Sequence, residues 1–221
     1  MKKGLVEIDW LSINKYSNEE ISYFLFLEGK TMEAICKIRN LDNSIVQKHI
    51  IDGKIKYRFL VHSNDTDELF KSIAKAGKED KIYFLNSINE DNKNKLIELI
   101  KTNYVEMHPK DKEVAVWILG ELNEKSCLNI LIKASVHKFI NVRRMAVSAM
   151  GKLGDLRAEG ALLRALEDEN PQVISYAIKS LGKIKSEKAI IKIKYIYENT
   201  DKQYIINAAQ SFLLLMGQME K

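Results

Sequence analysis

The chain has 221 residues, of which 46% are hydrophobic and 29% are charged, and its formal net charge at pH 7 is +5. With only 2 prolines and 10 glycines, this composition excludes collagen-like and proline-rich disordered proteins and favours helices. No membrane span or signal peptide is expected, so Cys36 and Cys127 are expected to be reduced thiols in the cytoplasm.

The first 61 residues are predicted to form a domain of three short helices. Ser17 and Glu20 have the spacing of a capping box, in which each side chain bonds the other residue's backbone N–H. This box predicts a first helix that ends at Gly29, and Thr31 and Asp42 are suited to cap a second and a third helix. A turn of about three residues separates the second helix from the third, which is typical of a helix-turn-helix.

The segment from residue 27 to residue 49 contains a turn at Gly29, an Ala34–Ile35 pair, a second turn at residues 38–41 and a Val46–His49 stretch. These features resemble the helix-turn-helix module appended to the C-terminus of RecQ-type DNA helicases and, more broadly, bacterial helix-turn-helix regulators. The resemblance covers only a small part of the chain, and the sequence has no helicase motor. It therefore implies nucleic-acid binding rather than unwinding, and it favours a bacterial source.

The third predicted helix is the candidate surface for contact with DNA. If Val46 and Ile50 face the core, Ile51 and several polar residues lie on the outer side, where polar groups can bond phosphates or base edges in the major groove. Basic residues that are expected to follow this helix directly can hold the DNA backbone. The candidate contacts are Asn43, Ser44, Gln47 and Lys48 within the helix, and Lys54, Lys56 and Arg58 after it. The alternative is a three-helix packing or dimerisation module with a solvated charged surface.

The next segment, residues 62–110, is also helical in pattern, with apolar stripes over residues 82–88 and 96–100. It is expected to be a helical connector or a divergent repeat that caps the repeats after it, with Asn89 where later copies carry glycine. The domains are therefore expected at residues 1–61, 62–110 and 111–221.

The C-terminal half of the sequence repeats itself every 31 residues. Aligned segments begin at Ala115, Ala146 and Ala177, each with a glycine five residues later, and a degraded fourth copy begins at Ala208. One further repeat position is always a large aliphatic residue, which predicts that this position is buried. The three glycines are Gly120, Gly151 and Gly182, and the three aliphatic residues are Leu131, Leu162 and Ile193.

Each copy is predicted to contain two short amphipathic helices, the first ending near its glycine because glycine permits the backbone found at many helix C-termini. One helix pair cannot bury its apolar face alone, so the copies are expected to stack into a solenoid with one continuous core. The pattern resembles the short HEAT-like repeat of the phycobilisome-lyase type over residues 111–216. This resemblance implies the fold and says little about function.

The second helix of each copy is expected to line the concave surface of the solenoid. Basic residues on these helices then form a groove that attracts DNA phosphates. The candidate groove residues are Arg157, Arg164, Lys185, Lys188 and Lys192. The alternative is that these residues are solvated surface in a lysine-rich chain. Arg143 and Arg144 are expected to have a structural role, with their stems covering apolar surface.

No motif predicts an enzyme. Gly29-Lys30-Thr31 lacks the earlier glycine of a phosphate-binding loop, and neither the histidines nor the cysteines have the spacing of metal ligands. Some HEAT-like proteins are DNA glycosylases that use Trp and Asp residues, but Trp117 lies in an apolar stripe with no adjacent Asp and is expected in the core. No cofactor and no metal are therefore expected.

The sequence thus predicts an all-α cytoplasmic protein, with an N-terminal three-helix helix-turn-helix followed by a short HEAT-like α-solenoid. The preferred hypothesis is a non-enzymatic DNA-binding or regulatory protein, in which the helix-turn-helix contacts duplex DNA and the solenoid contacts DNA or a protein partner. The alternative is a protein–protein interaction scaffold that binds no nucleic acid. The sequence leaves the DNA sequence preference, the partner and the oligomeric state open.

Overall fold

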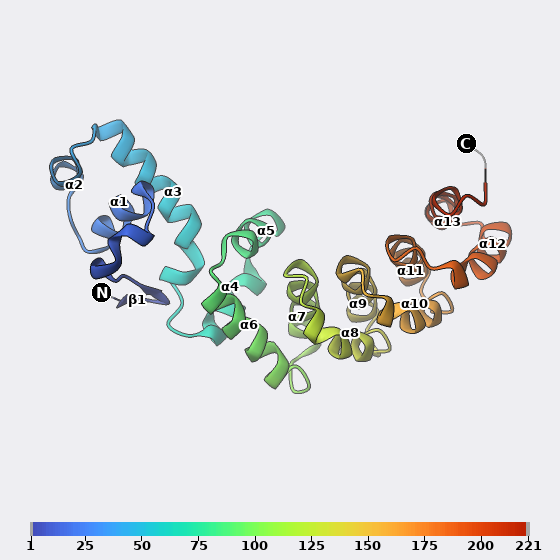
Figure 1. Cartoon of the computed structure of the whole chain (residues 1–221). Coiled ribbons are helices and arrows are strands. Elements are labelled where there is room, and N and C mark those ends of the chain that lie inside the picture. The colour runs from blue at the N-terminus through green and yellow to red at the C-terminus, as the bar shows by residue number, and fades with distance from the viewer. Residues whose placement is uncertain (1, 220–221) are drawn as a thin grey trace. The chain divides into compact units, whose positions relative to one another are not determined.

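The computed structural model describes residues 2–219. Contacts between residues divide the chain into two compact units, Met1–Leu96 and Ile97–Lys221 (Figure 1). Helices make up nearly all of the regular secondary structure, which confirms the predicted all-α fold. The sequence did not predict the small antiparallel hairpin at the start of the chain, in which β1 (Lys2–Lys3) pairs with β2 (Val6–Glu7).

The N-terminal unit contains the helix-turn-helix and the helices that follow it. The 3-10 helix η1 (Trp10–Lys15) leads from the hairpin into this part of the chain. The helix-turn-helix consists of α1 (Asn18–Leu27), α2 (Met32–Arg39) and α3 (Asn43–Val61). After it come α4 (Thr66–Lys75) and α5 (Lys78–Ser87), and then α6 (Glu90–Asn103), within which the boundary between the two units falls.

Local side-chain bonds set where α1 and α2 begin. The predicted capping box is present at α1, since the Glu20 N–H donates to Ser17 Oγ at 3.2 Å and the Ser17 N–H donates to Glu20 Oε2 at 2.8 Å. Thr31 caps α2 by accepting a hydrogen bond from the Ala34 N–H at 3.2 Å. Asp42 precedes α3 as predicted, but its side chain makes no capping hydrogen bond.

The helix-turn-helix closes around a small apolar core. Ile35 of α2 and Val46 and Ile50 of α3 are buried together, which confirms the predicted inner face of α3. Leu41, in the turn, packs against this group. The chain reverses at Asn40, whose φ of 50° lies in the left-handed region that Asn tolerates better than most residues.

The third helix is longer than expected, because α3 continues without a break from Ile51 to Val61. Gly53, which by itself disfavours a helix, is buried inside it. A Cβ atom at this position would lie 2.2 Å from the ring of Tyr23 in α1, so glycine is what allows α1 and α3 to pack this closely. Tyr23 also stacks on Tyr57 one turn further along α3, with ring centroids 5.6 Å apart. Contact with α1 therefore stabilises α3 through the stretch where the sequence favours an end.

The C-terminal unit consists of helices in two layers (Figure 1). The first layer contains α7 (Pro109–Glu121), α9 (Ile140–Leu153), α11 (Pro171–Lys183) and α13 (Gln203–Leu215). The second layer contains α8 (Leu128–Ala134), α10 (Glu159–Ala165) and α12 (Ile190–Asn199). Short 3-10 helices lead into the second-layer helices at positions 31 residues apart, namely η2 (Lys125–Cys127), η3 (Leu156–Ala158) and η4 (Glu187–Ala189).

The repeat register predicted from the sequence is confirmed by burial. Leu131, Leu162 and Ile193 are each fully buried at equivalent places in the second layer. Ala115, Ala146 and their equivalents are also buried where first-layer helices meet. One continuous core therefore runs through the stacked repeats, as expected of a solenoid.

The prediction that the second helix of each copy lines the concave surface is wrong. Successive first-layer helices pack tightly side by side, from α7 to α9, α11 and α13, whereas α8, α10 and α12 contact one another far less. Within this unit the more closely packed first layer therefore lies on the inner side of the curve (Figure 1). The sequence pattern shows which helices are amphipathic, but it does not show which layer is compressed when the repeats stack.

The explanation predicted for the repeated glycines also needs correction. Gly120, Gly151 and Gly182 lie near the ends of equivalent helices, as expected, but inside those helices and without a left-handed backbone. The left-handed residues that follow α7, α9 and α11 are instead Asn123, Gly154 and Lys185, with φ of 52°, 61° and 53°. At Gly120 and Gly151 the glycine instead permits close packing between neighbouring first-layer helices, whereas a Cβ atom at Gly182 would make only ordinary van der Waals contacts. At Gly151, for example, a Cβ atom would lie 2.2 Å from Ser180 Oγ of the next helix.

Candidate nucleic-acid interface

The N-terminal part of α3 carries the polar side chains that the sequence singled out. Asn43, Ser44, Gln47 and Lys48 are all exposed, and within residues 2–219 none of them makes a hydrogen bond or an ion pair with another side chain. Ser44, Gln47 and Lys48 lie three and four residues apart and so share one side of the helix. Their donors and acceptors are therefore open to an external ligand.

The same side of α3 continues towards its C-terminal end as a mixed polar and apolar stripe. Ile51 and Ile55 are 49% and 52% exposed and stand one turn apart. Lys54 is exposed beside them, and its ammonium group lies 4.9 Å from the centroid of the Phe26 ring. We call this stripe the outer face of α3; it comprises Ser44, Gln47, Lys48, Ile51, Lys54 and Ile55.

The three basic residues predicted to follow the helix lie inside α3, and they do not form one group. Lys56 lies off the outer face and pairs with Glu20 of α1, with Nζ 2.8 Å from Oε1. Arg58 pairs with Asp80 of α5 at 3.0 Å. Of the three, Lys54 alone has no acidic partner among the described residues. Of the expected basic cluster, only Lys54 therefore remains unpaired in the described part of the chain, and it lies on the same side of α3 as Lys48.

Glu20 is the centre of a polar cluster that joins α1 to α3. Besides Lys56, it accepts a hydrogen bond from the Tyr57 hydroxyl at 2.5 Å. Burial by itself raises the pKa of the Glu20 carboxyl, but the hydrogen bonds from Lys56, Tyr57 and the Ser17 backbone outweigh burial and hold the pKa below its usual value. Burial, together with the bond to Glu20, raises the pKa of Tyr57. Both groups therefore keep their ordinary charge states at neutral pH, and the cluster positions α3 rather than binding a ligand.

A second contact between α1 and α3 was not predicted, because its partners are 27 residues apart in the sequence. Ser22 Oγ lies 3.0 Å from Nδ1 of His49, and both side chains are buried. Nε2 of His49 lies 3.9 Å from a carboxylate oxygen of Glu19. His49 and Glu19 border a hollow of about 460 Å³ at the edge of the outer face. The hollow is lined by Glu19, Ser44, Ile45, Lys48, His49 and Asp52.

The basic groove predicted on the solenoid is not formed as expected. Most of its residues belong to the second layer or to the turns, and three of them are neutralised by nearby acids. Arg157 pairs with Asp155 at 2.6 Å, Lys188 pairs with Glu159 at 2.7 Å, and Lys192 pairs with Glu167. Arg164 is exposed on α10, and Lys185 is the left-handed residue after α11.

The two adjacent arginines of α9 have different roles. Arg143 is buried, and its guanidinium donates to both carboxylate oxygens of Asp168, at 2.7 and 2.9 Å, and to the His137 carbonyl at 3.0 Å. This confirms a structural role, although through an ion pair rather than through its stem. Arg144 is instead only partly buried, and its guanidinium lies 5.4 Å from the centroid of the Tyr176 ring in α11. Trp117, which was expected in the core, is only partly buried.

Within residues 2–219, no group of three or more His, Cys, Asp or Glu side chains is placed to hold a metal ion. Over the same range, each helix is too short or too polar to cross a lipid bilayer.

Comparison with known families agrees with this architecture. A family model of HEAT repeats matches residues 94–159 and 137–213, more than half of the chain, and a model of a helix-turn-helix domain matches residues 18–107. The chain therefore belongs to the HEAT repeat family and carries an N-terminal helix-turn-helix domain. No curated protein matches the chain. Among solved structures it is similar to a designed armadillo repeat protein in complex with the peptide (KR)4, with 17% sequence identity and a TM-score of 0.48. That similarity covers 77% of this chain and 94% of the designed protein.

Proposed function

We propose that this protein is a non-enzymatic, DNA-binding regulatory protein that contacts duplex DNA through the outer face of α3. In this proposal residues 1–61 form the DNA-binding domain, and the repeats in residues 111–221 hold a further partner. The observation that carries the proposal is the set of free polar groups at the start of α3. Asn43, Ser44, Gln47 and Lys48 follow a helix-turn-helix turn directly, which is where such domains place the side chains that read the major groove.

The charges around α3 limit how this contact can work. Lys48 and Lys54 are the cations of the outer face, since Lys56 and Arg58 are held by Glu20 and Asp80. Two lysines contribute a modest, sequence-independent attraction to phosphates. Any sequence preference must then come from Gln47 and its polar neighbours, because amide and hydroxyl groups can pair with base edges.

The test is fluorescence anisotropy of the full chain with a labelled mixed-sequence duplex at several salt concentrations. Removal of both cations in Lys48→Gln/Lys54→Gln should weaken binding to every duplex and lower the magnitude of the log–log salt slope by about 1.8, or about 0.9 for each lost phosphate contact. Gln47→Ala should weaken binding unevenly across duplexes of different sequence, by about 1–3 kcal/mol where a base contact is lost.

A matched control removes the same charge elsewhere in the N-terminal unit. Lys75 ends α4 and Lys78 begins α5, and both are exposed without an ion pair among the described residues. Lys75→Gln/Lys78→Gln should leave the affinity and the salt slope close to those of wild type. If the two double variants give the same curve, or if wild type binds no duplex at low salt, α3 does not bind DNA.

A specific observation favours a second candidate function, in which the same face of α3 binds a protein. Ile51 and Ile55 are half exposed one turn apart, and soluble proteins use such apolar pairs at interfaces. In this case Ile51→Ser/Ile55→Ser would abolish binding of the protein partner, or self-association if the partner is a second copy of the chain, as measured by analytical ultracentrifugation. Lys48→Gln/Lys54→Gln would have little effect on either. DNA binding predicts the opposite ranking of the two variants in the anisotropy assay.

A further inference from the structure

The first layer of the solenoid is strongly asymmetric in charge. The helices α9, α11 and α13 contain no Asp or Glu, whereas α9 and α11 carry Arg144, Lys152, Lys179 and Lys183 in addition to the buried Arg143. Acids outside these three helices do contact them: on α7, Glu113 lies 4.0 Å from Arg144 and Glu121 pairs with Lys152, and in the turn before α11, Glu169 lies 3.0 Å from Arg143. An anionic ligand therefore meets no repulsion from the three helices themselves.

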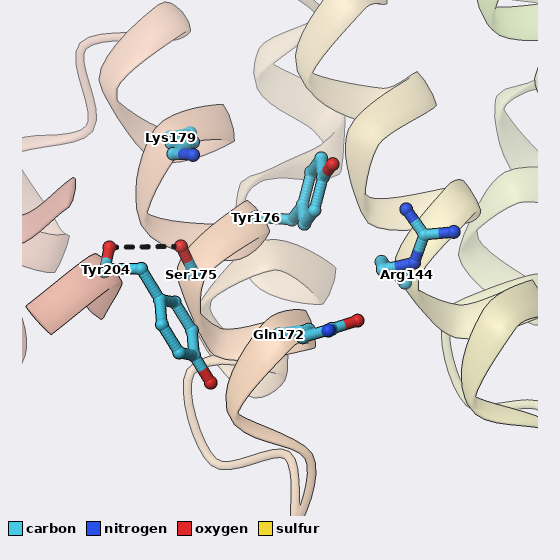
Figure 2. Close-up of a pocket in the computed structure, with 6 residues that line it drawn as sticks. All are labelled: Arg144, Gln172, Ser175, Tyr176, Lys179 and Tyr204. Atoms are coloured by element: carbon cyan, nitrogen blue, oxygen red, sulfur yellow. Dashed lines mark hydrogen bonds between the residues drawn. The ribbon is translucent and has the colours of Figure 1, made fainter. Parts of the chain in front are cut away.

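A cationic hollow of about 350 Å³ lies on this surface, bordered by α9, α11 and α13. Figure 2 shows the Tyr176 ring between the Arg144 and Lys179 side chains, and the two cationic groups lie 5.4 and 5.5 Å from its centroid. Lys179 has no ion pair within residues 2–219, and Arg144 is beyond hydrogen-bond distance of Glu113. Lys179 is thus free to bind an anionic group, and Arg144 is held only by its long contact with Glu113. The complete lining is Arg144, Gln172, Ser175, Tyr176, Lys179 and Tyr204.

An apolar hollow of about 220 Å³ adjoins the cationic one along the groove between α11 and α13, and Lys179 lines both. Its walls include Gly182 and Phe212, and Leu215 at its edge is 58% exposed. The space exists because the last interface is looser than its equivalents. A Cβ atom at Gly182 would be 3.5 Å from Phe212, whereas one at Gly151 would be 2.2 Å from Ser180.

We propose that the groove between α11 and α13 binds a short extended peptide with two anchors, an acidic side chain in the cationic hollow and a bulky apolar side chain in the apolar hollow. The anchors should be close in the peptide sequence. Tyr176 and Gly182 are separated by six helical positions, which corresponds to about 9 Å at about 1.5 Å per residue. An extended peptide covers that distance in about three residues. A nucleic-acid backbone fits less well, because the apolar hollow offers it no partner for a phosphate.

The test uses the full chain and an array of synthetic peptides in a Gly/Ser background. Each peptide carries one Glu and one Leu, with the Leu one to six positions before or after the Glu. Binding should be strongest when the two residues are about three positions apart. Replacement of the Glu by Gln, or of the Leu by Ser, should each lower the affinity of the best peptide at least tenfold.

Protein variants then locate the binding site. Arg144→Gln/Lys179→Gln should lower the affinity of the best peptide at least tenfold, and should remove the preference for Glu over Gln. Leu215→Ser should instead remove the preference for Leu over Ser. Lys133→Gln/Arg164→Gln, which removes two exposed cations from α8 and α10, is the matched control and should bind the peptide as wild type does.

Three results would overturn the proposal. One is that no peptide of the array binds, and another is that Glu and Gln peptides bind equally well. The third is that an oligonucleotide displaces the best peptide from Lys48→Gln/Lys54→Gln, in which the α3 cations are removed, which would assign the groove to phosphates. None of these results depends on α3, so failure here and failure of DNA binding can be told apart.

Discussion

The same substitution at two equivalent glycines should have opposite effects on stability. Gly151 and Gly182 occupy one repeat position, and both lie inside first-layer helices. Replacing an interior helical Gly with Ala stabilises a helix by about 0.5–1 kcal/mol, because Ala loses less backbone entropy on folding. What differs between the two sites is the space for the new methyl group.

At Gly151 the methyl group has no space. It would lie 2.2 Å from Ser180 Oγ and 2.9 Å from the Ser180 Cα, and a backbone atom cannot move aside without shifting α11. The Ser180 hydroxyl is also fixed, since it donates to the Val147 carbonyl at 2.9 Å. Overpacking of this kind costs about 1–3 kcal/mol, and loss of the hydrogen bond adds about 1 kcal/mol. After the gain in helix propensity, Gly151→Ala should destabilise the repeats by about 1–3 kcal/mol.

At Gly182 the nearest atoms are side-chain carbons of Phe212 and Leu215, at 3.5 and 3.7 Å, which is ordinary van der Waals contact. Gly182→Ala should therefore stabilise the repeats by up to about 1 kcal/mol. The measurement is denaturant unfolding followed by the fluorescence of Trp117, in a Trp10→Phe background so that only the C-terminal unit is reported. If Gly151→Ala is as stable as wild type, or if both variants lose the same stability, close helix packing does not explain the glycine at position 151.

Three further outcomes follow from buried groups. Leu162→Ala, at the fully buried repeat position, should cost about 2–5 kcal/mol in the same assay, and a cost below about 1 kcal/mol would contradict the assigned core. Arg143→Met leaves the carboxylate of Asp168 buried without its partner and should cost about 3–5 kcal/mol, much of which Asp168→Asn should restore in the double variant if the buried charge is the cause. The pKa of Glu20 is lowered in the folded state, so the stability that it contributes is present above its unfolded value near 4.5 and is lost as the pH falls through the folded value. Glu20→Gln should therefore destabilise the protein at pH 7 by about 1–3 kcal/mol and by progressively less below pH 4.5, and a deficit that does not change with pH would refute the role of its charge.

The parts of the structure that the sequence predicted depend on neighbours along the chain. The capping box at Ser17 and Glu20 spans one helical turn, so its residue types and spacing suffice to predict it. The 31-residue register likewise brings Leu131, Leu162 and Ile193 to one buried position, because each copy folds as its neighbours do. In both cases the spacing of the residues along the sequence is enough to predict the contact.

The parts that could not be predicted depend on contacts between distant segments. Nothing near Gly53 shows that Tyr23 packs against it and carries α3 past the expected end. Gly120 and Gly151 look like helix ends in the sequence, and only their distance from the next helix shows that they are packing residues. Contacts between repeats also determine which layer lies on the inner side of the curve, because that layer is the one whose helices pack more closely.

Ion pairs between distant residues also decide which cations can bind a ligand. A count along the sequence treats Lys54 and Lys56 as equal members of one basic cluster, but Lys56 is held by Glu20 and Lys54 is not. On the solenoid, Lys188 and Lys192 are paired with acids of α10 and of the loop after it, whereas Lys179 has no acidic partner among the described residues. Because a paired lysine must lose one contact to gain another, its net contribution to binding is small. Each proposed binding surface therefore contains a lysine without an acidic partner among the described residues, Lys54 on α3 and Lys179 on α11.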